Sequence, residues 1–254
     1  MKPARLRALG LLMIAAIAAA AIALWARERA APPLQERSAG ERPVAERPAL
    51  LLLTGLPLMF GDEFSLGGNG SPALAALQSR YRIQPISTGA ATELKGAGLL
   101  LMAQPSAQRP EDLVSIDRWV RSGGRVLILA DPALNWPSEH PLGDPLRPPP
   151  MFADTGLLAH WGLRLDAPES AGPQQLAIGS VQVLTGSPGT LVATAPTCAV
   201  EKGGLVARCR LGRGLATIIA DADFLDIGRP EGLDGPTQYN LSALTGELAL
   251  LERR

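Results

Sequence analysis

The chain has 254 residues, of which 46 % are hydrophobic and 19 % are charged, and its 24 basic residues balance its 24 acidic residues. This composition predicts a protein that buries a core, and it excludes a disordered tail and a polybasic nucleic-acid binder. Two cysteines and two histidines cannot supply a four-ligand zinc site as well as a separate cysteine–histidine catalytic pair. The composition therefore excludes much catalytic chemistry and a nucleic-acid partner, and we predict no cofactor and no bound metal.

The N-terminal segment, residues 1–26, is predicted to be a membrane anchor or a signal sequence. Residues 8–26 carry no charge and would form roughly 28 Å of helix, close to the thickness of a bilayer's hydrocarbon core. The basic residues before this stretch predict a cytoplasmic N-terminus. A cleaved signal peptide is the alternative. Both interpretations predict an exported C-terminal part, and the anchored one predicts a bacterial inner-membrane protein with a periplasmic C-terminal domain.

Residues 27–48 are rich in proline, arginine and glutamate and contain almost no large apolar residue. Such a composition is typical of an extended linker. The folded domain is therefore expected to span residues 49–254.

The first half of this domain alternates between strand and helix patterns. A continuous apolar run at 49–54 predicts a strand buried on both faces, and Ser71-Pro72 predicts the start of a helix. A short strand at 82–87, a buried strand at 98–103, a helix at 111–122 and a buried strand at 125–130 follow. This alternation predicts an α/β fold with a mostly parallel, doubly wound, flavodoxin-like sheet.

The second half begins with a proline-rich segment at 133–150, which we expect to be a long ordered loop, followed by a short helix near 155–161. Between about 175 and 210 the hydrophobic period becomes two, which predicts an antiparallel β insertion. Residues 215–220 predict another buried strand, and Asn240 is expected to cap a closing helix. The complete prediction is thus an α/β domain with a β insertion, preceded by one transmembrane helix.

Cys198 and Cys209 lie at equal distances from a predicted turn at Gly203-Gly204. In an oxidising compartment they could form a disulfide across the hairpin, and free buried thiols are the alternative. A two-residue turn would place them at a hydrogen-bonded pair, where the strands are further apart and a disulfide is more strained.

Three segments together resemble a known family: residues 52–62 (LLTGLPLMFGD), 117–132 (DRWVRSGGRVLILADP) and 211–224 (LGRGLATIIADADF). In their order, they are similar to the membrane-tethered auxiliary proteins of ABC-type transport systems, the gliding-motility group and its bacterial relatives. Those relatives carry a domain similar to class I glutamine amidotransferases. The resemblance implies a flavodoxin-like domain outside the cytoplasm, which interacts with ABC transporter subunits or other envelope proteins.

An active amidotransferase would need a cysteine at the turn between a strand and a helix. At the corresponding place this chain has Leu129-Ala130-Asp131-Pro132. We therefore expect no catalytic residue of this kind, and the predicted function is a non-catalytic, membrane-anchored accessory or scaffolding subunit of an ABC-type transport or envelope complex.

Polar residues at the ends of the predicted strands offer an alternative function. Ligands of doubly wound folds bind beyond the carboxyl ends of the strands, where Thr54, Asp131, Asp221 and Asp223 are predicted to lie, with His140 in the following loop. These residues could form a cleft for a small ligand such as a sugar, or serve a periplasmic metal-assisted hydrolase. The competing interpretation is that the aspartates only accept backbone hydrogen bonds in turns.

Overall fold

The computed structural model describes residues 41–59, 71–226 and 237–253. From Arg42 onward these residues belong to one compact unit. The end of the predicted linker already contacts this unit, because the Arg42 guanidinium donates two 2.9 Å hydrogen bonds to the Glu252 carboxylate near the C-terminus.

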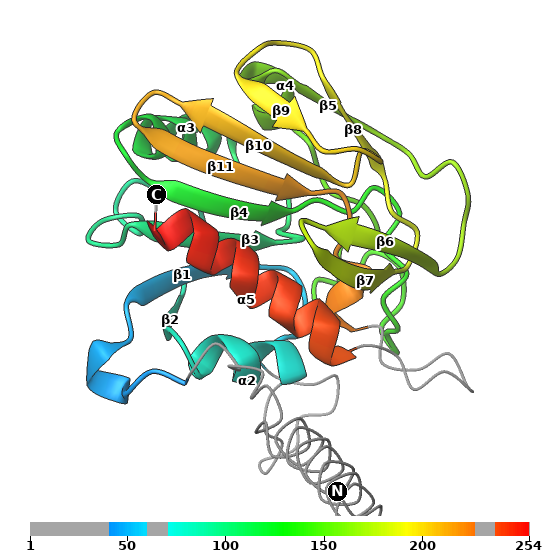
Figure 1. Ribbon diagram of the computed structural model, residues 1–254, viewed down its shortest axis with the longest axis horizontal. Helices are drawn as coiled ribbons and strands as arrows, with labels where there is room; N and C mark the ends of the chain where they lie inside the picture. The colour runs from blue at the N-terminus through cyan, green and yellow to red at the C-terminus, as the bar shows by residue number, and fades with distance from the viewer. Residues whose placement is uncertain (1–40, 60–70, 227–236, 254) are drawn as a thin grey trace, which may run out of the picture. The chain divides into compact units, whose positions relative to one another are not determined.

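A seven-stranded mixed sheet forms the centre of the domain (Figure 1), in the order β2-β1-β3-β4-β11-β10-β9. Its first five strands are parallel, whereas β10 and β9 are antiparallel additions at one edge. The bounds are β1 (Ala49–Thr54), β2 (Arg82–Pro85), β3 (Leu99–Ala103), β4 (Arg125–Leu129), β9 (Cys198–Val200), β10 (Val206–Leu211) and β11 (Gly214–Ile219).

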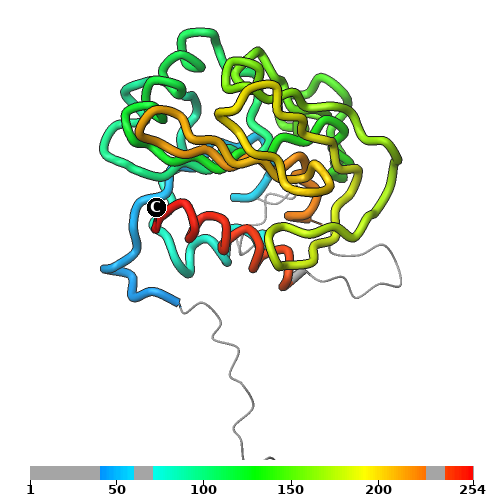
Figure 2. Tube along the Cα trace, turned by 45° about the horizontal axis from the view of Figure 1, so that its top comes forward, coloured from blue at the N-terminus to red at the C-terminus, as the bar shows by residue number. Residues whose placement is uncertain are grey.

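Helices cover both faces of the sheet, which explains why its central strands are apolar at nearly every position. In β1, Leu50 and Leu52 belong to one core, whereas Leu51 and Leu53 belong to the other. Helices α2 and α5 pack on the first face, and α3 and α4 pack on the second (Figures 1 and 2). The helical elements are η1 (Val44–Glu46), α2 (Pro72–Gln78), α3 (Pro110–Arg121), α4 (Leu157–Trp161), η2 (Asp223–Leu225) and α5 (Thr237–Arg253).

Two small antiparallel pairs complete the fold. Strand β5 (Leu163–Asp166) pairs with β8 (Thr190–Ala193). Strands β6 (Gln174–Ile178) and β7 (Val181–Thr185) form a hairpin, which contributes Ile178 and Val183 to the same core as α5.

The predicted α/β class agrees with this structure, but the more detailed fold prediction is wrong. The sheet is mixed, because two antiparallel strands extend its parallel part, and the segment 175–210 is not one insertion. Only β6 and β7 form a separate hairpin, because β9 and β10 join the main sheet alongside β11. Asn240 does not cap the last helix, because α5 already begins at Thr237.

The predicted transmembrane helix also requires correction. None of the helices in the described ranges is both long enough and apolar enough to cross a bilayer. The stretch 8–26, on which that prediction was based, lies outside the described residues. The structure therefore does not support an inner-membrane protein with a cytoplasmic N-terminus and a periplasmic C-terminal domain.

Cys198 and Cys209 form a disulfide between β9 and β10. The backbone bonds from Arg210 N to Thr197 O and from Glu201 N to Val206 O show which pairs of this ladder are hydrogen-bonded. Since hydrogen-bonded and non-hydrogen-bonded pairs alternate, the cysteines occupy a non-hydrogen-bonded pair, where the backbones are closer. The two cysteines lie opposite each other, as predicted. The turn between the strands is longer than the predicted two residues, so the cysteines do not occupy a hydrogen-bonded pair, and the predicted strain of such a position does not apply.

Replacing both cysteines by serine should destabilise the domain by about 3 kcal/mol, the entropic estimate for a loop of this length. Urea unfolding without reductant measures this difference. The reduced wild-type chain should match the double variant, and equal stability of the oxidised wild type and the variant would contradict the prediction.

Candidate functional site

Three aspartates meet at the carboxyl ends of β4 and β11. Asp131 follows β4, while Asp221 and Asp223 follow β11, and these strands are parallel neighbours with Leu129 opposite Ile219. One oxygen from each carboxyl group lies within 4.8 Å of the others. All three side chains are buried. We call this set the aspartate cluster.

Backbone N–H groups surround the cluster. The Asp131 carboxylate accepts hydrogen bonds from the N–H groups of Ala133 at 2.8 Å and Ala222 at 2.9 Å. These bonds join the end of β4 to the segment after β11. The carboxylate thus fixes two turns at once.

The other two aspartates extend this arrangement. Asp221 accepts from the N–H groups of Phe224 at 2.8 Å and Gly186 at 3.1 Å, and Asp223 accepts from Asn135 N–H at 2.9 Å. Gly186 is required here, because an added Cβ would lie 2.2 Å from Asp223 Oδ2. Every carboxylate oxygen of the cluster has a backbone donor.

Gln104 is a participant that the sequence analysis missed. It is fully buried after β3 and has a φ of 44°, in the left-handed region. Its side-chain amide accepts from Asp131 N–H at 2.9 Å and donates to Asp131 O at 3.0 Å. It also donates to Pro149 O. The only signal in the sequence was a polar residue between a buried strand and Pro105.

Of the predicted site residues, the structure brings together Asp131, Asp221 and Asp223 but not the other two. Thr54 Oγ1 donates to Ala103 O at 2.9 Å and accepts from Leu56 N–H, so it joins strand ends. His140 lies in the proline-rich loop with its Nδ1 3.8 Å from Asp144 Oδ2. Among the described histidine, cysteine and acidic side chains, only the three aspartates form a group that could hold a metal ion.

The proline-rich loop closes over this edge of the sheet. Leu134 N–H donates to Pro150 O, which joins the two ends of the loop, and Phe152 N–H donates to Asp131 O at 2.6 Å. Beside the end of β3, a cavity of about 10 Å³ lies between α3 and residues 152–157, which follow the loop, and it has room for one water molecule. The cluster does not line this cavity.

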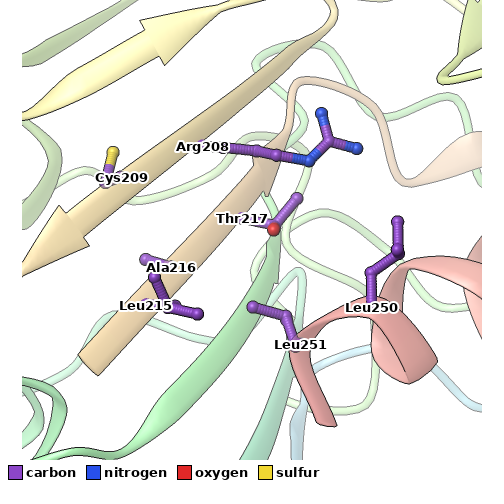
Figure 3. A pocket seen from close by; sticks show the side chains of 7 residues that line it. All are labelled: Arg208, Cys209, Leu215, Ala216, Thr217, Leu250 and Leu251. Carbon is purple, nitrogen blue, oxygen red and sulfur yellow. The ribbon is translucent and has the colours of Figure 1, made fainter. Parts of the chain in front are cut away.

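A second small cavity lies between β10, β11 and α5 (Figure 3) and measures about 20 Å³. Arg208 and Thr217 reach toward it, and Leu215, Leu250 and Leu251 supply most of its apolar wall. The Arg208 guanidinium is paired with the Glu201 and Glu247 carboxylates. This cavity therefore lies beside a partly buried ion-pair network and not beside the aspartate cluster.

Burial is the main cause that raises the pKa of each aspartate in the cluster, and the neighbouring carboxyl groups add to it for Asp221 and Asp223. The pKa of Asp221 is well above its ordinary value, and that of Asp223 rises to about 7. No described lysine, arginine or histidine forms an ion pair with them. Like charges this close cannot all ionise at low cost, so burial and mutual repulsion both favour the protonated form of these carboxyl groups.

The cluster should make the domain less stable as pH rises. An aspartate whose pKa is higher in the folded than in the unfolded chain contributes stability below pH 4, and this contribution is lost as pH rises through about 7. Asp223→Asn should flatten this dependence between pH 4 and 8, by on the order of a few kcal/mol. Urea unfolding across that range measures it, with Glu169→Gln at an exposed position as the control.

Gln104→Ala should cost about 1–3 kcal/mol, because it leaves the buried N–H of Asp131 without its partner. Gln104→Gly removes the same hydrogen bonds but relieves the positive φ, so it should cost less than the alanine variant. Thermal and urea unfolding compare the two. Wild-type stability of Gln104→Ala would show that this amide does not hold the strand ends.

No family model matches the chain, and no curated protein is similar to it in sequence. Several solved structures are similar at low identity. The exo-β-1,4-mannosidase Op5Man5 from Opitutaceae bacterium strain TAV5 is 16 % identical with a TM-score of 0.49, over 80 % of this chain and 36 % of the mannosidase. This chain therefore spans only about a third of that enzyme.

Two further structures are similar over most of their own length. The mmIFT52 N-terminal domain is 11 % identical with a TM-score of 0.48, over 79 % of this chain and 96 % of that domain. Cytoplasmic protein STM1381 from Salmonella typhimurium LT2 is 13 % identical with a TM-score of 0.49, over 70 % and 85 %. At this level none of the similarities assigns a function, and the resemblance to ABC-type auxiliary proteins stays a prediction.

Proposed function

We propose that the domain is a non-catalytic accessory or scaffolding subunit of a multiprotein complex. The observation that carries this proposal is the bonding of the aspartate cluster. The acids at the strand ends, where an α/β enzyme would place reactive groups, are buried and accept backbone N–H groups from the surrounding turns. With these hydrogen bonds, the carboxylate oxygens hold together the turns at the strand ends.

The cysteines support the same proposal. Cys198 and Cys209 are joined in a disulfide, so neither is a thiolate nucleophile. The segment after β4, where an amidotransferase would carry its cysteine, provides Asp131, and its carboxylate is a backbone acceptor. A transport complex of the ABC type is the assembly that the sequence resemblance favours.

A second candidate function is binding of a hard cation or a small hydroxylated ligand by the cluster. The separation of its oxygens, within 4.8 Å, favours it, because carboxylate oxygens are the preferred ligands of Ca²⁺ and Mg²⁺. That function would need the backbone donors of the proline-rich loop, Ala133 and Asn135, to release the carboxylates.

Cation titration separates the two functions. We expect that Ca²⁺, Mg²⁺ or Mn²⁺ in millimolar excess leaves the melting temperature of the full chain unchanged, because the carboxylates already have backbone donors. Asp131→Asn is the matched variant. A cation-dependent rise in melting temperature that Asp131→Asn abolishes would contradict the non-catalytic proposal and support the second function.

The accessory function also predicts a partner. Chemical cross-linking of the full chain in its own cells should recover the same transport-complex subunit in repeated experiments. Recovery of this chain alone would contradict the proposal.

A further inference from the structure

The sheets of the domain differ in how their edges are protected. Pro85 in β2 removes a backbone donor, and β5 carries Arg164 and Asp166. Prolines and charges at edge strands prevent pairing with other chains. Strand β6, by contrast, has the sequence Gln-Gln-Leu-Ala-Ile, with neither a proline nor a charge.

The hairpin β6–β7 has one edge occupied and one edge open. On β7, the Asn240 side-chain amide accepts from Leu184 N–H and donates to Leu184 O, both at 3.0 Å. This amide therefore occupies the β7 edge as a neighbouring strand would. On β6, no other described strand pairs with the outer edge.

The hydrogen-bonding pattern of the hairpin shows which backbone N–H and C=O groups of β6 point away from β7. Leu184 points its backbone groups out of the ladder, toward Asn240, and Gln175 lies directly opposite it. Residues opposite each other in an antiparallel pair share the same phase. Gln175 and, two residues later, Ala177 therefore direct their N–H and C=O groups outward. Both residues are exposed.

We propose that the outer edge of β6 is a self-association surface, on which the β6 strand of a second copy pairs antiparallel about Leu176. In this register Gln175 of each copy faces Ala177 of the other, and the outward groups form four N–H···O bonds. A register shifted by two residues toward the N-terminus would place Pro173 in the ladder and lose a donor. Strand β6 itself carries no charge that would oppose this pairing.

The small area that β6 can bury limits the affinity of the proposed dimer. One five-residue strand buries far less than the roughly 800 Å² per partner of a stable interface. The dimer is therefore weak and forms where the local concentration is high, for example on a multiprotein scaffold. This inference does not depend on the proposed function.

Sedimentation equilibrium of the full chain tests the proposal. Ala177→Pro removes an outward N–H without breaking the β6–β7 ladder and should weaken dimerisation about tenfold. The matched control Gln182→Pro makes the same change on β7, opposite Ala177, and should leave the dimer unchanged. A wild-type chain that stays monomeric up to about 1 mM, or an equal effect of both variants, would overturn the proposal.

A second pair of variants keeps the test valid if proline disturbs the hairpin. Ala177→Lys and Ala177→Glu each place like charges on diagonal positions across the two-fold axis, within reach of long side chains. Each variant alone should dimerise less than the wild type, and an equal mixture should recover association. Association that the charges do not change would place the contact elsewhere.

Cross-linking tests the register. Leu176→Cys should form a disulfide between copies under mild oxidation, because residue 176 faces itself across the axis. Gln182→Cys, exposed on β7, should not. Equal cross-linking of the two variants would contradict pairing about Leu176.

Discussion

The structure depends on burying three carboxyl groups where two parallel strands end. Strands β4 and β11 are neighbours, so the residues that follow them converge, and those residues are Asp131, Asp221 and Asp223. Such a burial is costly unless the carboxyls are hydrogen-bonded or protonated. Here backbone N–H groups from the turn after β4, from Gly186 and from the segment before η2 meet that need.

This bonding determines what lies over the carboxyl edge of the sheet. The proline-rich loop leaves β4 at Asp131, is held by Asp223 through Asn135, and returns beside Gln104. Proline lacks a backbone donor, so side-chain carboxylates and the Gln104 amide anchor a segment that could not form a regular ladder. The edge at which an α/β fold usually binds its ligand is thus closed by the loop, which is why we favour a structural role for the cluster.

Much of the central sheet could be predicted from the sequence, because a strand buried on both faces is apolar at every position. The leucine-rich runs at 49–54 and 125–130 are of this kind and correspond to β1 and β4. The antiparallel extension could not be predicted, since an alternating pattern at 198–211 fits an edge of the main sheet as well as a separate insertion. At the site, the positions of the aspartates followed from the strand ends. The contribution of Gln104 did not, because it depends on a loop returning from forty-five residues further along the chain.

Asn240 is a second residue whose role could not be predicted from the local sequence. An asparagine before an apolar helical pattern is typical of an N-cap, yet this one lies inside α5 and bonds to the backbone of Leu184 and Phe224. Local preference was overridden by a buried strand edge that needed a partner.

Amide hydrogen exchange of the full chain, followed by NMR, tests most directly whether the cluster serves the fold. The N–H groups of Ala133, Asn135 and Gly186 lie outside helices and strands, and their acceptors are the buried carboxylates. The account predicts that these amides exchange as slowly as those of the central strands. Exchange as fast as in exposed loops, or protection that arises only when a divalent cation is added, would contradict it.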